Sequence, residues 1–450
     1  MKPKRAVRKQ LFDLTSPIFI EVLLIMLLGA TDVVMLSRYS DDTVAAVGVV
    51  NQLLNLIFIL YGITTLGTSV LCSQYLGARQ HKNVIQVIGV SVLVNAVMGF
   101  FVSAGLYLFA PHLLQVMGLE PRLADYGVMY MKIVGGFSFL QAVSMTVSAV
   151  LRSHNKAYYP MFVTLFINVL NIVGNYTLIF GKFGFPRLGA TGAAISTSAC
   201  RLVALSLLFY LLFGKVVTRF PLRYLKPFPW DKIKNLMIIG LPAAGEQVSY
   251  NLSQVVITYF SVLISTSALT ARTYAMNIVM FSYVFSIAIG NGAAISIGHL
   301  IGRERDNAAF SVEKYSINLS LLVTLCISVL TALVGTTIFK WLSPNPEVVR
   351  IGALILYIDI ALELGRAVNI TSVNSLNAAG DVFYPFVTGI IVMWGVAVLG
   401  GWFWGVWWGW GLAGIWVAMA LDECIRAVVF ERRWHSRKWE TKGFTRGKRA

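Results

Sequence analysis

The sequence predicts an all-α integral membrane protein with twelve transmembrane helices in two six-helix lobes related by pseudo-two-fold symmetry. Composition is the first reason: 57% of the 450 residues are hydrophobic and 13% are charged, whereas soluble domains carry about 25% charged residues. The second is that residues 84–110 and 158–180 contain no charged side chain. Each run exceeds the roughly 20 residues that cross a bilayer as a helix. The third is an internal repeat.

Apolar runs of this length recur along the whole chain. The expected spans are residues 12–37, 43–76, 84–109, 122–150, 158–180, 188–213, 231–262, 267–301, 312–341, 347–378, 383–405 and 409–431. With both termini placed in the cytoplasm, most of the 37 Lys and Arg residues fall on the cytoplasmic side, as the positive-inside rule requires. We therefore expect a multi-pass protein of a bacterial inner membrane with both termini cytoplasmic.

The net charge of +17 would suit a nucleic-acid-binding protein, but the distribution of charge argues against that role. Basic residues gather at the chain ends and beside the spans, where they set topology and contact anionic membrane lipids. The four cysteines and five histidines have no ligand spacing, and the G-x-x-x-x-G-K-[ST] phosphate loop is missing. We therefore expect no metal, no cofactor, no nucleic-acid partner and no enzymatic activity.

An internal repeat relates the two halves of the chain at a constant offset of 225 residues, as from residue 17 to residue 242. Residues matched at this offset occupy equivalent points of the hydropathy pattern. The pairs are Pro17 and Pro242, Glu21 and Glu246, Gly67 and Gly292, Gly77 and Gly302, Pro121 and Pro346, and Pro160 and Pro385. Because each half contains an even number of spans, both halves have the same orientation, as in transporters built from parallel repeats.

The repeat divides the chain into two lobes and three short basic segments. These are a cytoplasmic N-terminus at 1–10, an N-terminal lobe at 11–213, a cytoplasmic linker at 214–230, a C-terminal lobe at 231–434 and a cytoplasmic tail at 435–450. Two parallel bundles can rock and expose a central cavity to each side in turn. Duplication also builds channels and membrane enzymes, so the repeat alone does not assign transport.

Carboxylates within the predicted spans are the main candidates for function, because a charge at the bilayer centre costs roughly 3 kcal/mol on insertion scales. They are Glu21, Asp32, Glu246, Asp359 and Glu363. A carboxylate in apolar surroundings can exchange a proton near neutral pH or bind a sodium ion. Asp32 has no basic residue in its own span, which favours a role in ion coupling.

Two further polar groupings leave alternatives open. Glu363 and Arg366 share a helical face at i, i+3, and they form either a functional polar cluster or a structural ion pair. In the fifth span, Asn168, Asn171 and Asn175 form a stripe spaced by three and four residues. Such a stripe either joins helices or lines a cavity, and the aspartate of the first span, in the same half, favours the cavity.

Three segments resemble the MATE (multidrug and toxic compound extrusion) family of antiporters, in particular its bacterial NorM-like members. The first span places Asp32 after Pro17, as in the family's proline–aspartate pattern. Residues 174–194, GNYTLIFGKFGFPRLGATGAA, give the most specific match, and residues 377–381, NAAGD, resemble the loop after the tenth span. The resemblance covers roughly residues 11–434. It implies two six-helix lobes, a V-shaped cavity and the exchange of protons or sodium for organic substrates.

The resemblance also suggests roles for individual residues. It implies that Asp32 is the cation-coupling carboxylate of the N-terminal lobe and that Asn171 and Asn175 match polar positions of that lobe. In some members an aspartate stands at the position of Asn175, so this chain keeps less negative charge there.

The C-terminal lobe departs from the sodium-coupled NorM pattern. Tyr250 stands where those members have a glutamate, and Arg366 where they have an aspartate. Glu246 lies one turn before the first of these positions and Glu363 lies three residues before the second. These departures favour H+ over Na+ as the coupling ion, with Glu246 and Glu363 as further cation-coupling candidates.

The expectation is therefore a monomeric secondary exporter that exchanges protons for small organic cations, drugs or amphipathic metabolites by rocker-type alternating access. Its expected substrate-cavity residues are Asn168, Asn171, Asn175 and Arg366. An alternative is a flippase of the same superfamily that moves lipid-linked or larger polar cargo. A membrane-embedded transferase is disfavoured, because no cluster of Asp or His residues lies on a loop at the membrane face.

Overall fold

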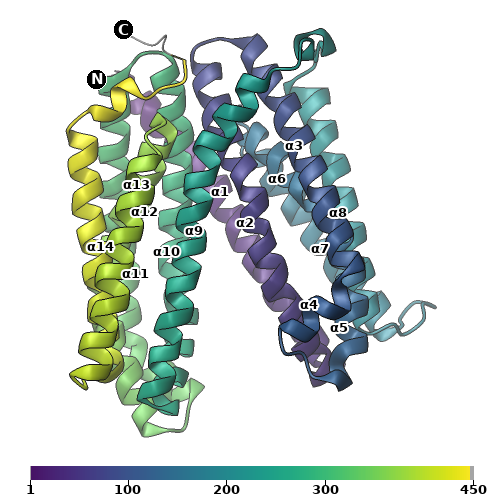
Figure 1. The fold of residues 1–450 in the computed structure, drawn as a ribbon, viewed down its shortest axis with the longest axis vertical. Helices are drawn as coiled ribbons and strands as arrows, with labels where there is room; N and C mark the ends of the chain where they lie inside the picture. The colour runs from purple at the N-terminus through teal and green to yellow at the C-terminus, as the bar shows by residue number, and fades with distance from the viewer. Residues whose placement is uncertain (1, 446–450) are drawn as a thin grey trace. The chain divides into compact units, whose positions relative to one another are not determined.

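The computed structural model of the chain describes residues 2–445, and every regular element in that range is a helix (Figure 1). The α-helices are α1 (Lys2–Ser37), α2 (Asp41–Gly77), α3 (His81–Leu108), α4 (Ala110–Val116), α5 (Ala124–Tyr130), α6 (Ser138–Ser153), α7 (Tyr158–Phe180), α8 (Ala190–Leu211), α9 (Trp230–Ile264), α10 (Thr266–Gly302), α11 (Asp306–Leu342), α12 (Pro346–Ala379), α13 (Phe383–Val392) and α14 (Gly411–His435). Short 3-10 and π-helical segments lie between or after them: η1 (Pro121–Leu123), η2 (Met131–Gly135), η3 (Leu212–Val216), η4 (Leu222–Leu225), η5 (Met393–Val398), η6 (Gly401–Trp407) and η7 (Lys438–Thr441).

Each of the twelve expected spans corresponds to a helix or to a series of helical segments, which confirms the all-α membrane fold. The fourth span is composite: Pro121–Gly135 and Ser138–Ser153 meet at a bend of 42°. The eleventh span continues from α13 through the π-helical η5 and η6. In both spans the helix loses regularity beside glycines, which is where α-helical propensity is lowest.

Three long helices differ in polarity from the rest. Among the described residues, eight helices are long and apolar enough to cross a membrane, or nine with the bent pair Pro121–Gly135 and Ser138–Ser153. The long helices outside this group are α9, α12 and α14. Within about two turns, α12 carries Asp359, Glu363 and Arg366. Polar groups of this kind persist in a membrane protein only when other protein groups surround them.

Contacts divide the described chain into two compact units, called the N-terminal lobe and the C-terminal lobe from here on. The N-terminal lobe comprises Ile20–Leu76 and Gln80–Gly240. The C-terminal lobe comprises the start of α1 as far as Phe19, Gly77–Arg79 and the chain from Leu241 onwards. Each lobe has its own buried apolar core.

The lobe boundaries differ in detail from those expected at residues 11–213 and 231–434. The start of α1 belongs to the C-terminal lobe, because Leu11 is 1% exposed in a core with Ala293 and Ile297. Conversely, the linker and the start of α9 belong to the N-terminal lobe, and there the Lys232 ammonium donates to the Tyr75 hydroxyl at 3.3 Å. The lobe to which each of these segments belongs therefore follows from its hydrophobic contacts and hydrogen bonds, and not from the position of the repeat boundary.

Glycines set the distance between α7, which carries the asparagine stripe of the N-terminal lobe, and α8. A Cβ added to Gly174 in α7 would meet the side chain of Ser196 in α8, and a Cβ on Gly192 in α8 would meet the backbone of Leu178 in α7. Both glycines belong to the segment that carries the family resemblance. They bring α7 and α8 into close contact, which fixes the position of α7 beside α8.

A glycine also sets the distance between α12 and α14, the two helices of the C-terminal lobe that carry buried charged residues. A Cβ on Gly365 in α12 would meet the backbone of Cys424 in α14. Beside this contact, Trp416 packs fully buried in a core with Leu356 and Leu362. The close approach places the ionisable residues of α12 and α14 opposite one another inside the lobe.

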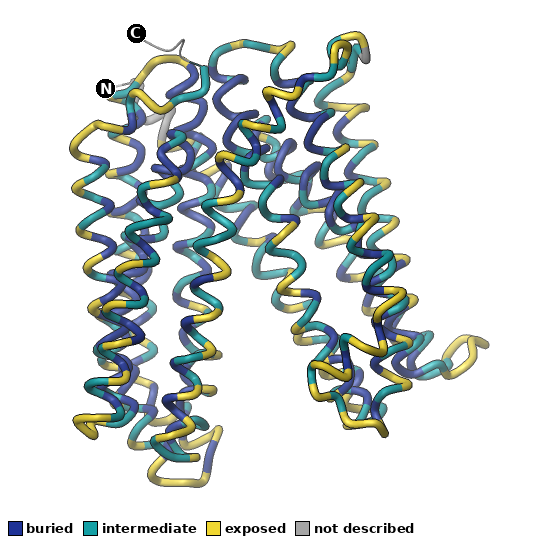
Figure 2. The backbone as a smooth tube through the Cα atoms, viewed as in Figure 1, coloured by how far each residue is buried: buried dark blue, intermediate teal, exposed yellow. Residues whose placement is uncertain are grey.

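Large apolar side chains cover the outer helix faces. Phe101 is 69% exposed, Leu333 is 68% exposed and Ile391 is 66% exposed. Figure 2 shows exposed residues recurring along the whole length of the helices. Apolar surface on this scale is unfavourable in water, whereas it is what a helix presents to lipid chains.

Candidate functional site

Asp32 and the asparagines of α7 meet in the N-terminal lobe. Asn175 Nδ2 donates to Asp32 Oδ1 at 2.6 Å and to Asn171 Oδ1 at 2.9 Å. Both asparagines are almost fully buried. Because they are four residues apart, they lie on one face of α7, directly against α1. The structure thus brings together three of the residues expected at the N-terminal site.

The third asparagine of the stripe has a different partner. Asn168 Nδ2 donates to the backbone carbonyl of Leu24 at 2.7 Å, about two turns from the Asp32 contact along both helices. This bond joins α7 to α1 through the backbone, so Asn168 acts as an interhelical contact. Asn168 thus joins helices, one of the two roles that the spacing left open, and the lining of a cavity by the stripe stays a prediction.

Arg201 is a member of this site that the sequence did not reveal. Its Nη1 donates to the carbonyl of Val134 at 3.1 Å and its guanidinium lies 5.6 Å from the centroid of the Phe58 ring. It interacts electrostatically with Asp32 and with Tyr130, but it forms no salt bridge with Asp32. Arg201 lies inside the sixth expected span, so its position within the membrane could be read from the sequence. Whether its side of α8 faces Asp32 depends on how the helices pack.

Glu21, the other carboxylate of α1, is paired with a cation. Arg152 Nη1 donates to both carboxylate oxygens of Glu21, at 3.0 and 3.1 Å. The Glu21 side chain is 7% exposed and that of Arg152 is 24% exposed. Within the N-terminal lobe, Glu21 is therefore held in a structural ion pair, whereas Asp32 is held by neutral amides.

In the C-terminal lobe, Arg366 lies at the centre of a buried ionic network. Its Nη1 donates to Glu363, its Nε lies 3.3 Å from Glu423 Oε1, and its guanidinium lies 5.4 Å from the centroid of the Tyr283 ring. Asn369 Nδ2 donates to the second oxygen of Glu423 at 2.6 Å. Arg366, expected to line a substrate cavity, is thus engaged with two carboxylates.

The network continues along α14 and back to α12. Arg426 Nε donates to Asp422 Oδ1 at 3.0 Å, and its Nη2 lies 3.2 Å from Glu423 Oε1. Trp416 Nε1 donates to Asp359 Oδ1 at 3.1 Å. The two acids of α14, Asp422 and Glu423, were not among the carboxylates expected at the site, and Arg426 joins them to the network.

Glu246 lies beside this network without a salt bridge in the described chain. Its carboxylate packs against Gly389 of α13 and interacts electrostatically with Arg426 and Glu423. Its repeat partner, Glu21, is paired with Arg152, but the position 225 residues after Arg152 is Asn377. The acid is thus present in both halves, whereas its cation is present in the first half alone.

The charge balance of the network is negative. Five carboxylates (Glu246, Asp359, Glu363, Asp422 and Glu423) face two guanidinium groups (Arg366 and Arg426). Full ionisation would leave an excess of three negative charges in a low-dielectric interior, which costs several kcal/mol for each uncompensated ion. Glu363 Oε2 also has no hydrogen-bond partner among the described residues. The network therefore has the capacity to hold protons.

Neither lobe has the geometry of a metal centre within residues 2–445. No group of three His, Cys, Asp or Glu residues in that range is placed to hold a metal ion. Cys72 and Cys200 are buried as free thiols. What the two sites offer is carboxylates, amides and guanidinium groups inside a helical membrane protein, which suits ion binding and proton exchange.

Known proteins match this chain along nearly its whole length. The MatE family model matches residues 17–177 and 242–403, whose starting points are 242 − 17 = 225 residues apart, the offset of the repeat. The uncharacterized transporter YisQ of Bacillus subtilis (strain 168) is 40% identical over 433 residues, covering 96% of this chain and 95% of that protein. A probable multidrug resistance protein NorM of Thermotoga maritima is 26% identical over 436 residues, covering 96% and 93%.

Solved structures agree on the fold. A mutant of the Vibrio cholerae MATE transporter VcmN superposes with a TM-score of 0.90 at 19% identity, covering 98% of this chain and all of that one. A MATE structure in the bent conformation gives a TM-score of 0.89 at 18% identity, covering 96% of this chain and 95% of that chain. The expected architecture of twelve membrane helices in two lobes is confirmed. The family model and the transporter relatives exclude the membrane-embedded transferase.

Proposed function

Because the chain belongs to the MATE family of membrane transporters, we propose that it is a proton-coupled exporter of small organic cations, drugs or amphipathic metabolites. The observation that carries the proposal is the setting of Asp32, a carboxylate inside the membrane region that is held by Asn175 at 2.6 Å and by no salt bridge. Relatives named as probable multidrug resistance proteins support this class of substrate.

Protonation of Asp32 would change the contact between α1 and α7. In its ionised form the carboxylate accepts a hydrogen bond from Asn175 Nδ2. A protonated carboxyl group donates instead, and Asn175 Oδ1 has no partner among the described residues. Rotation of the Asn175 amide by half a turn would offer that oxygen to the new donor. One proton can thus exchange one interhelical hydrogen bond for another and bias the position of α1.

The donors around the acids favour a proton over sodium. A sodium ion needs several oxygen ligands directed at one point, whereas Asp32 receives an amide NH2 group and lies near the cationic Arg201. In the C-terminal lobe, the guanidinium of Arg366 already lies between Glu363 and Glu423. A bound metal cation would have to displace an arginine there.

The proposed cycle is rocker-type alternating access between two lobes of parallel orientation. Proton uptake at Asp32 would favour one state of the N-terminal lobe and substrate binding the other, so that each ligand promotes release of the other. We place the transporter in a bacterial inner membrane, as a monomer with both termini in the cytoplasm. The distribution of Lys and Arg residues supports this orientation.

Purified protein in liposomes tests the proposal. A pH gradient without sodium is expected to drive a fluorescent organic cation in the direction opposite to the protons, and a protonophore is expected to abolish the movement. A sodium gradient at uniform pH is the matched control and should drive nothing. Strict dependence on sodium would contradict proton coupling, and movement of labelled lipid instead of organic cations would favour the flippase.

A further inference from the structure

The linker between the two halves is folded onto the start of α3 within the N-terminal lobe. Gln86 Nε2 donates to the carbonyl of Tyr224 at 2.9 Å. Leu225 and Phe220 pack against Gly89, where a side chain on α3 would block them. The linker therefore packs as part of the lobe, and its basic residues lie beside the start of α3.

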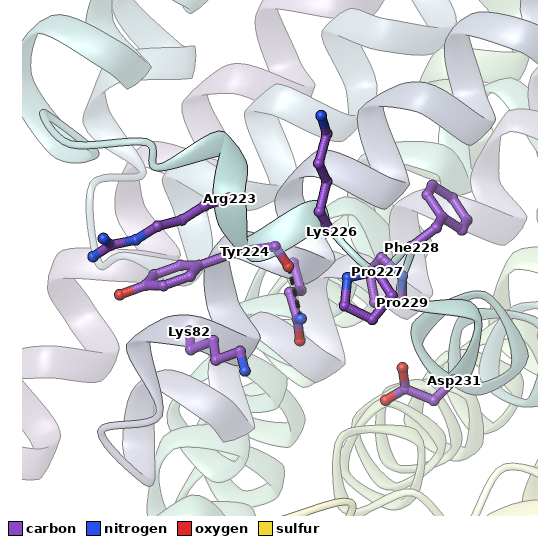
Figure 3. Close-up of a pocket in the computed structure, with 9 residues that line it drawn as sticks. Lys82, Arg223, Tyr224, Lys226, Pro227, Phe228, Pro229 and Asp231 are labelled. Carbon is purple, nitrogen blue, oxygen red and sulfur yellow. Dashed lines mark hydrogen bonds between the residues drawn. The ribbon is translucent and has the colours of Figure 1, made fainter.

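A cavity of about 380 Å³ lies between this linker and α3 (Figure 3). Its volume falls in the range of about 300–1,000 Å³ that is usual for small-ligand sites. Lys82, Arg223 and Lys226 line it together with Tyr224 and Pro227. The Arg223 guanidinium lies 5.5 Å from the centroid of the Tyr224 ring, and Lys82 lies below that ring in the view of Figure 3.

The positive charge in this cavity is not compensated by the protein. Lys82, Arg223 and Lys226 form no salt bridge with any carboxylate in the part of the chain that the structure describes. Asp231, the acid at the rim of the cavity, is already paired with Lys232 at 2.9 Å. All three cations are exposed, and Figure 3 shows Lys82 and Arg223 beside the Tyr224 ring and Lys226 directed away from them. Positive charge on one concave surface attracts an anion, and the first turn of α3 adds the positive end of its dipole.

The C-terminal lobe contains the repeat counterpart of this cavity, with the opposite charge arrangement. The counterpart of Lys82 is Asn307, since 82 + 225 = 307, and it lines a cavity between the start of α11 and the chain after α14. There Arg437 Nη1 donates to Asn307 Oδ1 at 2.8 Å and to Glu440 Oε1 at 3.0 Å. This second cavity is also lined by Arg305 and by the acids Glu304 and Asp306. Its carboxylates therefore outnumber its cations, so an excess of positive charge is not a consequence of the fold.

We infer that the cavity formed by Lys82, Arg223 and Lys226 binds a phosphate-bearing anion. Lysine and arginine side chains, with an aromatic wall, suit the phosphate of an anionic lipid headgroup or of a soluble phosphate ester. The cavity lies in the segment that the positive-inside rule assigns to the cytoplasmic face, where anionic lipid is abundant. Binding there would hold the linker against α3 and stabilise the N-terminal lobe. The inference does not depend on the substrate or the coupling ion.

The test measures binding of defined phosphates to the purified full-length protein in detergent, by native mass spectrometry and by the shift of the unfolding temperature. The probes are short-chain phosphatidylglycerol, glycerol 3-phosphate, and phosphatidylcholine as a zwitterionic control. The variants are Lys82→Gln, Arg223→Gln and Lys226→Gln, singly and combined. Arg437→Gln is the matched control, because it removes an arginine from the counterpart cavity.

The combined variant is expected to weaken phosphatidylglycerol binding by about tenfold or more, since each cation near an anionic headgroup contributes roughly fivefold. Arg437→Gln is expected to leave binding within about twofold. Preference for phosphatidylglycerol would assign the ligand as a lipid, and equal binding of glycerol 3-phosphate would assign it as a soluble ester. Unchanged binding of both in the combined variant would overturn the inference. If that variant does not fold, unchanged binding in Arg223→Gln alone overturns it.

Discussion

The two lobes share a scaffold, but the central carboxylates of their candidate sites have different partners. In the N-terminal lobe, Asp32 is bound by the neutral amide of Asn175. In the C-terminal lobe, Glu363 and Glu423 are tied to Arg366. A carboxylate held by an amide can change charge while its neighbours stay satisfied, whereas a carboxylate in an ion pair leaves a buried cation behind when it is neutralised.

One pair of repeat-equivalent positions illustrates this difference. The counterpart of Glu363 is Ser138, since 363 − 225 = 138. Ser138 shares neutral hydrogen bonds with Tyr61 at 2.8 Å and with Ser103 at 3.0 Å. The same place in the scaffold thus holds hydroxyl groups in one lobe and an ion pair in the other. The two lobes share the helix scaffold, but the polar side chains at this position differ.

Replacing Asp32 with asparagine is expected to have the largest effect on coupling. Asp32→Asn keeps the size of the side chain and removes the titrating group, so substrate movement driven by a pH gradient should fall by roughly 5- to 150-fold, the usual span of a coupling free energy. Transport in liposomes measures it, with size-exclusion chromatography as the control for folding. Full proton-driven transport in this variant would contradict the assignment of proton coupling to Asp32 in the N-terminal lobe.

Removing the central arginine of the C-terminal lobe should affect stability most. Arg366→Met leaves Glu363 and Glu423 without their shared cation and is expected to lower the unfolding free energy by about 3–5 kcal/mol. Thermal unfolding followed by tryptophan fluorescence measures this. The double variant Glu363→Gln with Arg366→Met should recover part of the loss, because fewer buried charges are left uncompensated. An unchanged unfolding temperature would show that the network is not structural.

A variant of the Glu21–Arg152 ion pair tests whether Glu21 and Asp32, the two carboxylates of α1, have different roles. Glu21→Gln removes the charge that balances a partly exposed arginine, so the expected loss of unfolding free energy is smaller, about 1–3 kcal/mol. Proton-driven transport per folded molecule should be retained. Comparing this variant with Asp32→Asn in the same liposome assay tests whether coupling belongs to the amide-bound acid. A loss of coupling in Glu21→Gln would place part of the proton pathway at the ion pair.

The smallest effect is expected at the interhelical asparagine. Asn168→Ala removes one hydrogen bond to the backbone of α1, and such bonds between membrane helices average about 0.6 kcal/mol. Substrate specificity should be unchanged, since the amide is used for packing. A change in the substrate profile across a panel of cations would instead show that Asn168 lines the transport path.

The sequence by itself determined the spans, the repeat and the spacing of the asparagines along α7. Hydropathy runs, a fixed offset and a spacing of three and four residues can each be read along the chain without knowing which helices meet. The resemblance added the expected role of Asp32, which stays a prediction. The assignment of Glu246 and Glu363 to cation coupling also stays a prediction.

Only the tertiary structure decided which polar groups meet. Asn175 reaches Asp32 across 143 positions of sequence, and Arg152 reaches Glu21 across 131. Arg201 faces the Asp32 site from a third helix, and Arg366 joins α12 to α14. The direction in which a helix turns each side chain depends on glycine contacts between helices, such as that of Gly365 with α14. Hydropathy measures how apolar a helix is, and it carries no information about which neighbour that helix packs against.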